Sequence, residues 1–165
     1  GADIQMSLWD IASGPVASLE AEFGGENHHI FQRAAVADEP DVRGADFVFI
    51  DPPDKNCWPE IREFLKQAPN EQAILVWLPV AANAMTTPPT EDRMSKNCRM
   101  EALALPGFRA SKVRWAKGGR TIGCQLIYRL PPPALEALRS AIECVVKAAD
   151  WQDDTELLGA VHYDP

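Results

Sequence analysis

The sequence predicts an α/β fold in which helices cover both faces of a mostly parallel β-sheet. Segments typical of strands and helices alternate along the chain in the order β-α-β-β-α-β-α-β-β-α, which is a pattern of α/β proteins. Two strand segments, residues 46–50 and 72–80, are almost wholly apolar, as is typical of strands buried on both faces. The 165 residues are enough for one domain with a sizeable core. We expect this domain to span residues 1–150, followed by an acidic tail at 151–165.

The first half of the chain is expected to form a strand, a helix and two further strands. The first strand ends near Asp10. A helix over 15–23 follows, because its apolar residues have helical spacing and a proline suits its first turn. Two glycines at 24–25 end this helix. The second strand covers 28–36 and the third covers 46–50.

The second half of the chain is expected to add three helices and three strands. The two β-rich segments flank KGG and predict a hairpin, which places an antiparallel strand near the C-terminal side of the sheet. The last helix has a continuous apolar stripe. In chain order, the six expected elements are a helix at 58–68, a strand at 72–80, a helix at 91–105, strands at 107–116 and 120–130, and a helix at 132–149.

The charge of the chain argues against a protein that grips nucleic acid over its whole surface. The formal net charge is −8, whereas phosphate contacts need clustered Lys and Arg. Residues 107–131 nevertheless contain six basic residues and no Asp or Glu. This segment is either a solvated hairpin face or a local RNA-binding patch. The candidate patch residues are Arg109, Lys112, Arg114, Lys117 and Arg120. An aromatic residue that is considered below is grouped with them.

Composition also indicates the compartment and makes a metal site unexpected. The four cysteines are scattered and form no C-x-x-C pair, so we expect no zinc and instead free thiols in a reducing cytoplasm. His28 and His29 have no accompanying acid or cysteine pattern, and an edge-strand position is expected for them. No apolar run approaches the ~20 residues of a membrane helix, and no signal peptide is visible. We therefore expect a cytoplasmic protein without membrane contact.

An acid and two prolines end the third strand, in the sequence FVFIDPPD. Ligands of open α/β sheets bind outside the carboxyl ends of the strands, where Asp51 is expected to lie. Pro52 and Pro53 cannot donate to a strand ladder, so they end the strand and stiffen the following loop. Asp51 could then accept hydrogen bonds from an exocyclic amine. The alternative is that the prolines only terminate the strand and Asp51 caps the next helix.

The segment FIDPPD resembles the (N/D)-P-P-(Y/F/W) motif of S-adenosylmethionine-dependent amino methyltransferases. Four segments, LWDIASGPVASLEAEF, RGADFVFIDPPD, ILVWLPV and GCQLIYRLPPPALEALRSAIECVV, are similar in order and spacing to large-subunit ribosomal RNA adenine-N6 methyltransferases of the RlmJ type. The resemblance implies a truncated Rossmann-like methyltransferase sheet, in which Asp51, Pro52 and Pro53 form the catalytic motif. It also implies that Asp10 binds the ribose hydroxyls of S-adenosylmethionine, although an acid at this place suits a helix cap equally well.

Two of the departures of this sequence from the family pattern concern the cofactor loop and the catalytic motif. The first strand of the family and its glycine-rich cofactor loop have no counterpart here, and Asp54 stands where the motif has an aromatic residue. A carboxylate offers no face on which a base can stack, although Trp77 follows a family aromatic and is expected near the site. We therefore expect a degenerate domain that has lost cofactor binding and acts as an oligomeric binding module. The alternative is an adenine-N6 methyltransferase of RNA or DNA, completed by a partner chain or an N-terminal segment.

The family resemblance also predicts an oligomeric state. In the methyltransferase sheet the unmatched first strand lies centrally, between the family's second and fourth strands. These two strands correspond to the first and third strands expected in this chain. The absence of the family's first strand leaves strand edges that must be closed by direct re-pairing, by a terminal segment or by a partner chain, because unpaired edges are aggregation templates. We expect a homodimer.

Overall fold

The computed structural model describes residues 6–9, 17–18, 20–22, 28–31, 40–52, 55–83, 90–115, 121–151 and 161–164. The chain divides into two compact units, Gly1–Ala45 and Asp46–Pro165. The two acids predicted at strand ends thus fall in different units: Asp10 belongs to the first unit and Asp51 to the second.

The first unit contains a parallel strand pair. Strand β1 (Met6–Trp9) pairs with β2 (His28–Phe31), with Met6 opposite His28. Residues 17–18 and 20–22, between the two strands, are helical, so the predicted strand-helix-strand order is confirmed. A short helix, α2 (Pro40–Arg43), lies between the expected second and third strands.

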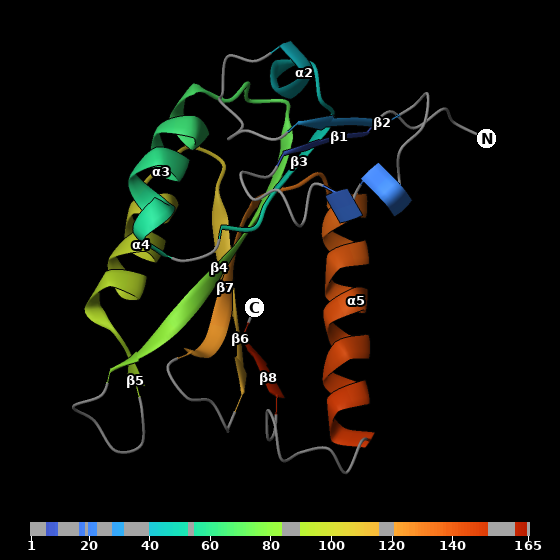
Figure 1. Ribbon diagram of the computed structural model, residues 1–165. Helices are drawn as coiled ribbons and strands as arrows, with labels where there is room; N and C mark the ends of the chain where they lie inside the picture. The colour runs from blue at the N-terminus through green and yellow to red at the C-terminus, as the bar shows by residue number, and fades with distance from the viewer. Residues whose placement is uncertain are drawn as a thin grey trace. The chain divides into compact units, whose positions relative to one another are not determined.

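The second unit is built on a mixed sheet (Figure 1). Its strands follow the order β3-β4-β7-β6-β8, and β5 pairs with β4 outside this path. The pairing of β3 with β4 is parallel, and all other pairings described in this sheet are antiparallel. The strands are β3 (Phe47–Ile50), β4 (Ala73–Asn83), β5 (Thr90–Glu91), β6 (Arg109–Trp115), β7 (Thr121–Arg129) and β8 (Val161–Asp164).

The strand directions agree with the predicted α/β class. Because β7 is antiparallel to both β4 and β6, the strands β3, β4 and β6 run in one direction. The predicted hairpin is β6–β7, and β7 is the antiparallel strand expected near the C-terminal side. Parallel pairing is nevertheless less extensive than the sequence suggested, because β7 lies between β4 and β6. The segment expected to be a tail also differs, since Val161–Asp164 join the sheet as β8 beside β6.

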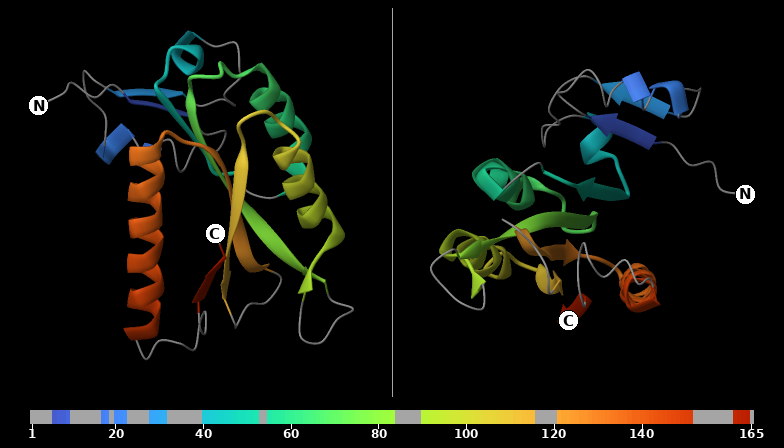
Figure 2. Two further views of the ribbon diagram at one scale, coloured as in Figure 1. Left: turned by 180° about the vertical axis from the view of Figure 1, so that it is seen from behind. Right: turned by 60° about the horizontal axis from the view of Figure 1, so that its bottom comes forward.

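Helices cover both faces of this sheet (Figure 2). The turn η1 (Lys55–Cys57), α3 (Trp58–Gln67) and α4 (Arg93–Leu103) lie on one face, and α5 (Pro132–Trp151) lies on the other. The buried residues form two clusters that the sheet separates. One cluster lies under α3 and α4 and includes Ile74, Val76 and Leu78, which are fully buried. The other lies under α5 and includes Leu126 and Ile142.

Local sequence explains where the helices begin and which faces they bury. Pro59 occupies the first turn of α3, and the buried Trp58, Ile61 and Leu65 have helical spacing. Trp58 is therefore a core residue, as expected. Helix α4 begins after Asp92, whose carboxylate accepts a hydrogen bond from the backbone N–H of Ser95 at 2.7 Å. This is a standard N-cap.

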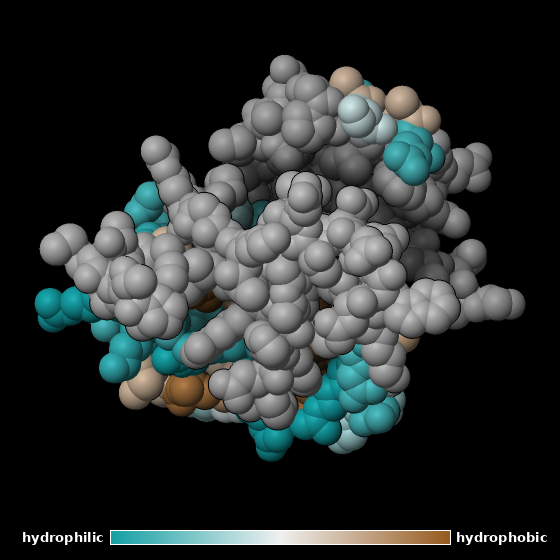
Figure 3. Space-filling view, turned by 90° about the horizontal axis from the view of Figure 1, so that it is seen from below, coloured by the Kyte–Doolittle hydropathy of each residue, from teal (hydrophilic) through white to brown (hydrophobic). Residues whose placement is uncertain are grey.

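One face of the described part of the chain is mainly polar. On the face seen from below, most of the coloured residues are hydrophilic and a few are hydrophobic (Figure 3), consistent with the charge of −8. Within the described ranges, no helix combines the length and apolar character needed to cross a bilayer. The four cysteines are free: Cys98 and Cys124 are buried, Cys57 is half-buried and Cys144 is exposed.

Candidate functional site

The register of the parallel strands β3 and β4 brings two of the predicted site residues together at the carboxyl end of β3. The last paired residues are Ile50 and Val76, so Asp51 and Trp77 are the next residues along the two strands. Asp51 is exposed, and Trp77 retains 38% exposure. An exposed carboxylate at the carboxyl end of β3 therefore lies beside an exposed indole within β4, which continues to Asn83. Ligands of open α/β sheets bind outside the carboxyl ends of the strands.

The proline after Asp51 is held in the protein interior. Pro52 is buried, whereas Asp51 is exposed, as expected if the proline fixes the end of β3. The remaining two motif residues, Pro53 and Asp54, lie outside the described residues, as does the expected cofactor residue Asp10.

The negative charge of Asp51 affects the pKa of a buried thiol on β7. Burial raises the pKa of the Cys124 thiol to about 12, and the negative charge of Asp51 contributes to this rise. Cys124 belongs to the cluster under α5 and lies opposite Pro79 of β4. A carboxylate in this position can accept hydrogen bonds from an amine, and the Trp77 ring can stack on a planar group. Among the described residues, no group of His, Cys, Asp and Glu side chains could hold a metal ion.

The described part of the expected basic patch does not form one surface. Arg109 and Lys112 are three residues apart on β6, so their side chains lie on opposite faces of the sheet. Arg109 is exposed. Lys112 is mostly buried and forms an ion pair with Glu91 at 2.5 Å. Arg114 lies further along β6, and Lys117 and Arg120 lie outside the described residues. An RNA-binding patch at 109–120 stays a prediction.

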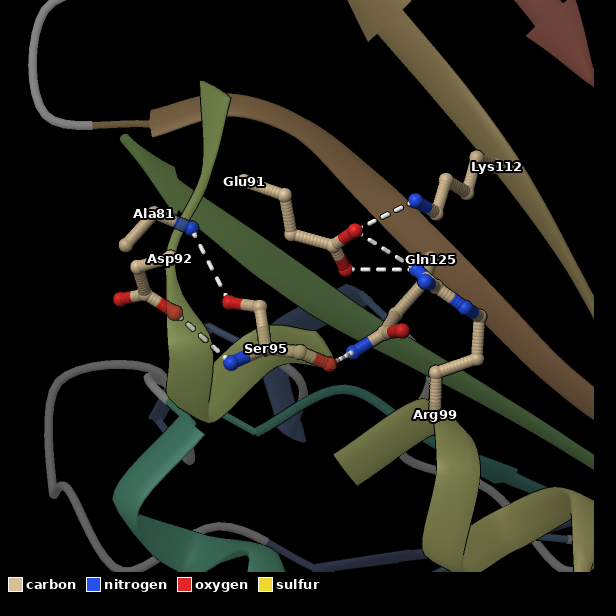
Figure 4. A network of polar contacts seen from close by, with 7 residues as sticks. All are labelled: Ala81, Glu91, Asp92, Ser95, Arg99, Lys112 and Gln125. Atoms are coloured by element: carbon tan, nitrogen blue, oxygen red, sulfur yellow. Dashed lines mark hydrogen bonds and ion pairs between the residues drawn. The ribbon is translucent and has the colours of Figure 1, made fainter. Parts of the chain in front are cut away.

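Sequence reasoning missed the ion cluster that engages Lys112 (Figure 4). Glu91 accepts hydrogen bonds from Arg99 at 2.6 and 2.8 Å and one from Lys112 at 2.5 Å. Burial raises the pKa of Glu91, but the hydrogen bonds and charges of Arg99 and Lys112 outweigh it and hold this pKa below its ordinary value. The cluster joins β5, α4 and β6. No local motif signals it, because its members belong to three different elements and Lys112 lies 21 residues after Glu91.

The first turn of α4 is also tied to the sheet (Figure 4). The backbone N–H of Ala81 donates to Ser95 Oγ at 3.3 Å, and Gln125 Nε2 donates to the Ser95 carbonyl at 3.1 Å. Lys55 pairs with Asp92, the N-cap of the same helix. Strands β4 and β7 and the turn η1 therefore fix where α4 begins.

Sequence reasoning predicted the apolar strand β3 but not its exposure. Phe47 and Phe49 are 50% and 53% exposed, whereas Val48 and Ile50 pack against the cluster under α3 and α4. Strand β3 is at one end of the strand order of this sheet, and among the described strands it pairs only with β4. We call its other side, along Phe47–Ile50, the open edge of β3.

Comparisons with known proteins show the fold alone. A solved structure of a DUF519 protein from Legionella pneumophila str. Philadelphia 1 matches with a TM-score of 0.61 and 17% identity, covering 96% of this chain. This chain spans 59% of the length of that protein. A structure of a point mutant of MtNAS reaches a TM-score of only 0.34, at 15% identity, over 76% of this chain and 44% of that one, which is too low to show a shared fold. No family model and no curated protein matches the sequence. The chain therefore shares its α/β fold with the DUF519 protein.

Proposed function

We propose that this chain is a methyltransferase-like domain that has lost S-adenosylmethionine binding and acts as an oligomeric binding module. The open edge of β3 carries the proposal. Ligands of open α/β sheets bind in a crevice between neighbouring strands, at the point where strand order changes. Among the described strands, β3 has a neighbour on one side only, so one wall of such a crevice is absent beside Asp51.

The exposed apolar residues support a binding role. The described part of the chain has five large exposed hydrophobic side chains, and three of them, Phe47, Phe49 and Trp77, lie on β3 and β4. Neighbouring exposed aromatics on one sheet are typical of interaction surfaces. The basic residue Lys112 is instead engaged by Glu91. These features favour an apolar protein partner over RNA.

Calorimetric titration of S-adenosylmethionine into the purified chain tests the loss of cofactor binding. We expect no binding heat up to millimolar ligand. Micromolar binding that disappears in Asp10→Ala, and persists in the exposed-surface variant Glu63→Ala, would overturn the proposal. It would also establish that Asp10 holds the cofactor.

The juxtaposition of Asp51 and Trp77 supports a second candidate, an adenine-N6 methyltransferase of RNA or DNA completed by another chain or segment. Asp51 would accept a hydrogen bond from the adenine amine, and Trp77 would stack on the purine, a contact worth ~1–3 kcal/mol. S-adenosylmethionine would supply the methyl group. A methyl-transfer assay on unmodified ribosomal RNA and on DNA tests this candidate. Activity lost in Asp51→Ala and retained in Glu63→Ala is the expected signature, and inactivity on both substrates contradicts it.

A further inference from the structure

We infer that the partner at the open edge of β3 is a second copy of this chain, whose own β3 pairs with it antiparallel across a two-fold axis at Val48. This inference rests on the proposed role as an oligomeric module, and it names the partner and the geometry. Four features of β3 lead to it: the direction of its backbone groups, its composition, its exposed aromatics and its self-complementary register.

Backbone groups of β3 are directed toward the open edge. The N–H of Ala73 on β4 donates to the carbonyl of Asp46 at 3.0 Å. Successive residues of a strand direct their N–H and C=O groups to alternate sides, so Asp46 and Val48 face β4. Phe47 and Phe49 therefore present two donors and two acceptors along the open edge. These are the groups to which an added strand binds.

The composition of β3 does not protect this edge. Natural edge strands avoid pairing by means of charged side chains, prolines or bulges. The sequence of β3 is FVFI, without any of these. Strand β8, at the other end of the sheet, has the sequence VHYD and includes an acid and a histidine. Of the two ends of the described strand order, the edge at β3 is therefore the one better suited to pairing.

A single register makes two copies of β3 complementary. With the two-fold axis at Val48, Phe47 lies opposite Phe49 of the partner subunit, and Phe49 lies opposite Phe47 of the partner subunit. Both pairs bring edge-directed backbone groups together, so each forms two hydrogen bonds. The four phenyl rings gather on one face as aromatic cross-strand pairs.

The neighbouring registers are less favourable. An axis at Phe49 places the exposed Asp51 opposite Phe47 of the partner subunit, which removes water from a carboxylate without giving it a partner. An axis at Phe47 places Ala45 opposite Phe49 of the partner subunit and loses half of the aromatic pairing. The Val48 axis alone pairs all four rings, and an isologous interface of this kind closes at a dimer.

The mass of the full chain as a function of concentration, measured by analytical ultracentrifugation, is the first test. We expect a monomer–dimer equilibrium, because a short paired edge is a small interface. Phe49→Lys should weaken the dimer by about tenfold or more, because two ammonium groups would flank the paired edge. The matched control is Met100→Lys, since Met100 on α4 is 56% exposed and far from β3 in the sequence. It should leave the equilibrium unchanged, and circular dichroism should show both variants folded.

Disulfide trapping tests the register. In a Cys144→Ser background, Val48→Cys should give a covalent dimer on oxidation, because residues opposite each other in a non-hydrogen-bonded pair have Cα atoms ~4.5 Å apart, within disulfide range. Phe49→Cys should give no covalent dimer. With this axis, Phe49 lies opposite Phe47 of the partner subunit, and Phe49 of the partner subunit lies two residue pairs further along the edge. Cross-linking through Phe49→Cys alone would overturn this register.

The outcomes separate this inference from the proposed function. A monomer at every concentration overturns the inference, as does a dimer that withstands Phe49→Lys. The second result would still leave an oligomeric module that uses another surface. The loss of cofactor binding is decided separately, by the titration with S-adenosylmethionine.

Discussion

Replacing Glu91 with Gln should destabilise the second unit by about 2 kcal/mol. Glu91 accepts three hydrogen bonds from Arg99 and Lys112, and it links β5 to α4 and β6. Glutamine keeps the shape but removes the charge, so the guanidinium and the ammonium group lose their counter-charge in a mostly buried place.

The magnitude follows from the exposure of the three side chains. Removing one partner of a fully buried ion pair costs ~3–5 kcal/mol, whereas an exposed pair contributes ~0–1 kcal/mol. The side chains of Glu91 and Lys112 are each 13% exposed and that of Arg99 is 18% exposed, so water screens the remaining charges in part. This places the cost between the two limits, at about 2 kcal/mol. With a urea slope of ~2 kcal/mol per molar, the unfolding midpoint should fall by about 1 M.

Urea unfolding followed by far-UV circular dichroism measures this cost, with Glu63→Gln as the matched control. Glu63 also accepts hydrogen bonds from a lysine and a second side chain, Lys66 and Gln67, but it lies on the exposed face of α3. Its substitution should leave the midpoint unchanged. Equal midpoints for Glu91→Gln and Glu63→Gln would refute the stabilising role of the cluster.

The same cluster predicts a pH dependence. The pKa of Glu91 is lowered from 4.5 in the folded chain, so folding favours its ionised form. Its contribution to stability is present above pH 4.5 and is lost as the pH falls through the lower, folded value. The stability difference between the wild type and Glu91→Gln should therefore shrink on acidification. A difference that grows on acidification would contradict this sign.

Two further predictions concern the tryptophans and the thiols. Trp58 is buried and its Nε1 donates to Glu101, so Trp58→Ala should cost ~3–5 kcal/mol, whereas Trp77→Ala at the exposed position should cost less than about 1.5 kcal/mol in the same urea assay. Burial raises the pKa of Cys98 to about 11 and that of Cys124 to about 12. Maleimide labelling followed by mass spectrometry should therefore modify the exposed Cys144 and leave these two unmodified until the chain unfolds.

Local patterns in the sequence were sufficient for most elements of the second unit. The apolar runs at 46–50 and 72–80 are β3 and β4, and the segments around KGG form the β6–β7 hairpin. Helix α3 has the predicted apolar face because its residues pack on the adjacent sheet. These predictions depend on periodicity and on turn residues, which are local properties.

Features that depend on distant pairing were not predictable in the same way. Strand β8 gains its hydrogen bonds from β6, almost fifty residues earlier in the chain, and the acidic segment 151–165 that contains it resembles a tail. Lys112 appeared to be part of a basic surface because its partner, Glu91, belongs to another element. A single sequence shows the charge of a residue but not the partner that neutralises it.

The open edge of β3 can accept one strand at a time, so the two candidate functions compete for it. A completed methyltransferase-like sheet needs a parallel strand beside β3, whereas the proposed dimer needs an antiparallel β3 from a second copy. Dimerisation and completion of the sheet should then exclude each other. If a partner chain restores S-adenosylmethionine binding, its affinity should fall as the concentration of this chain rises above the dimer dissociation constant. Phe49→Lys would weaken the dimer and so abolish this dependence on concentration. Cofactor binding that is independent of the concentration of the wild-type chain would contradict competition for β3.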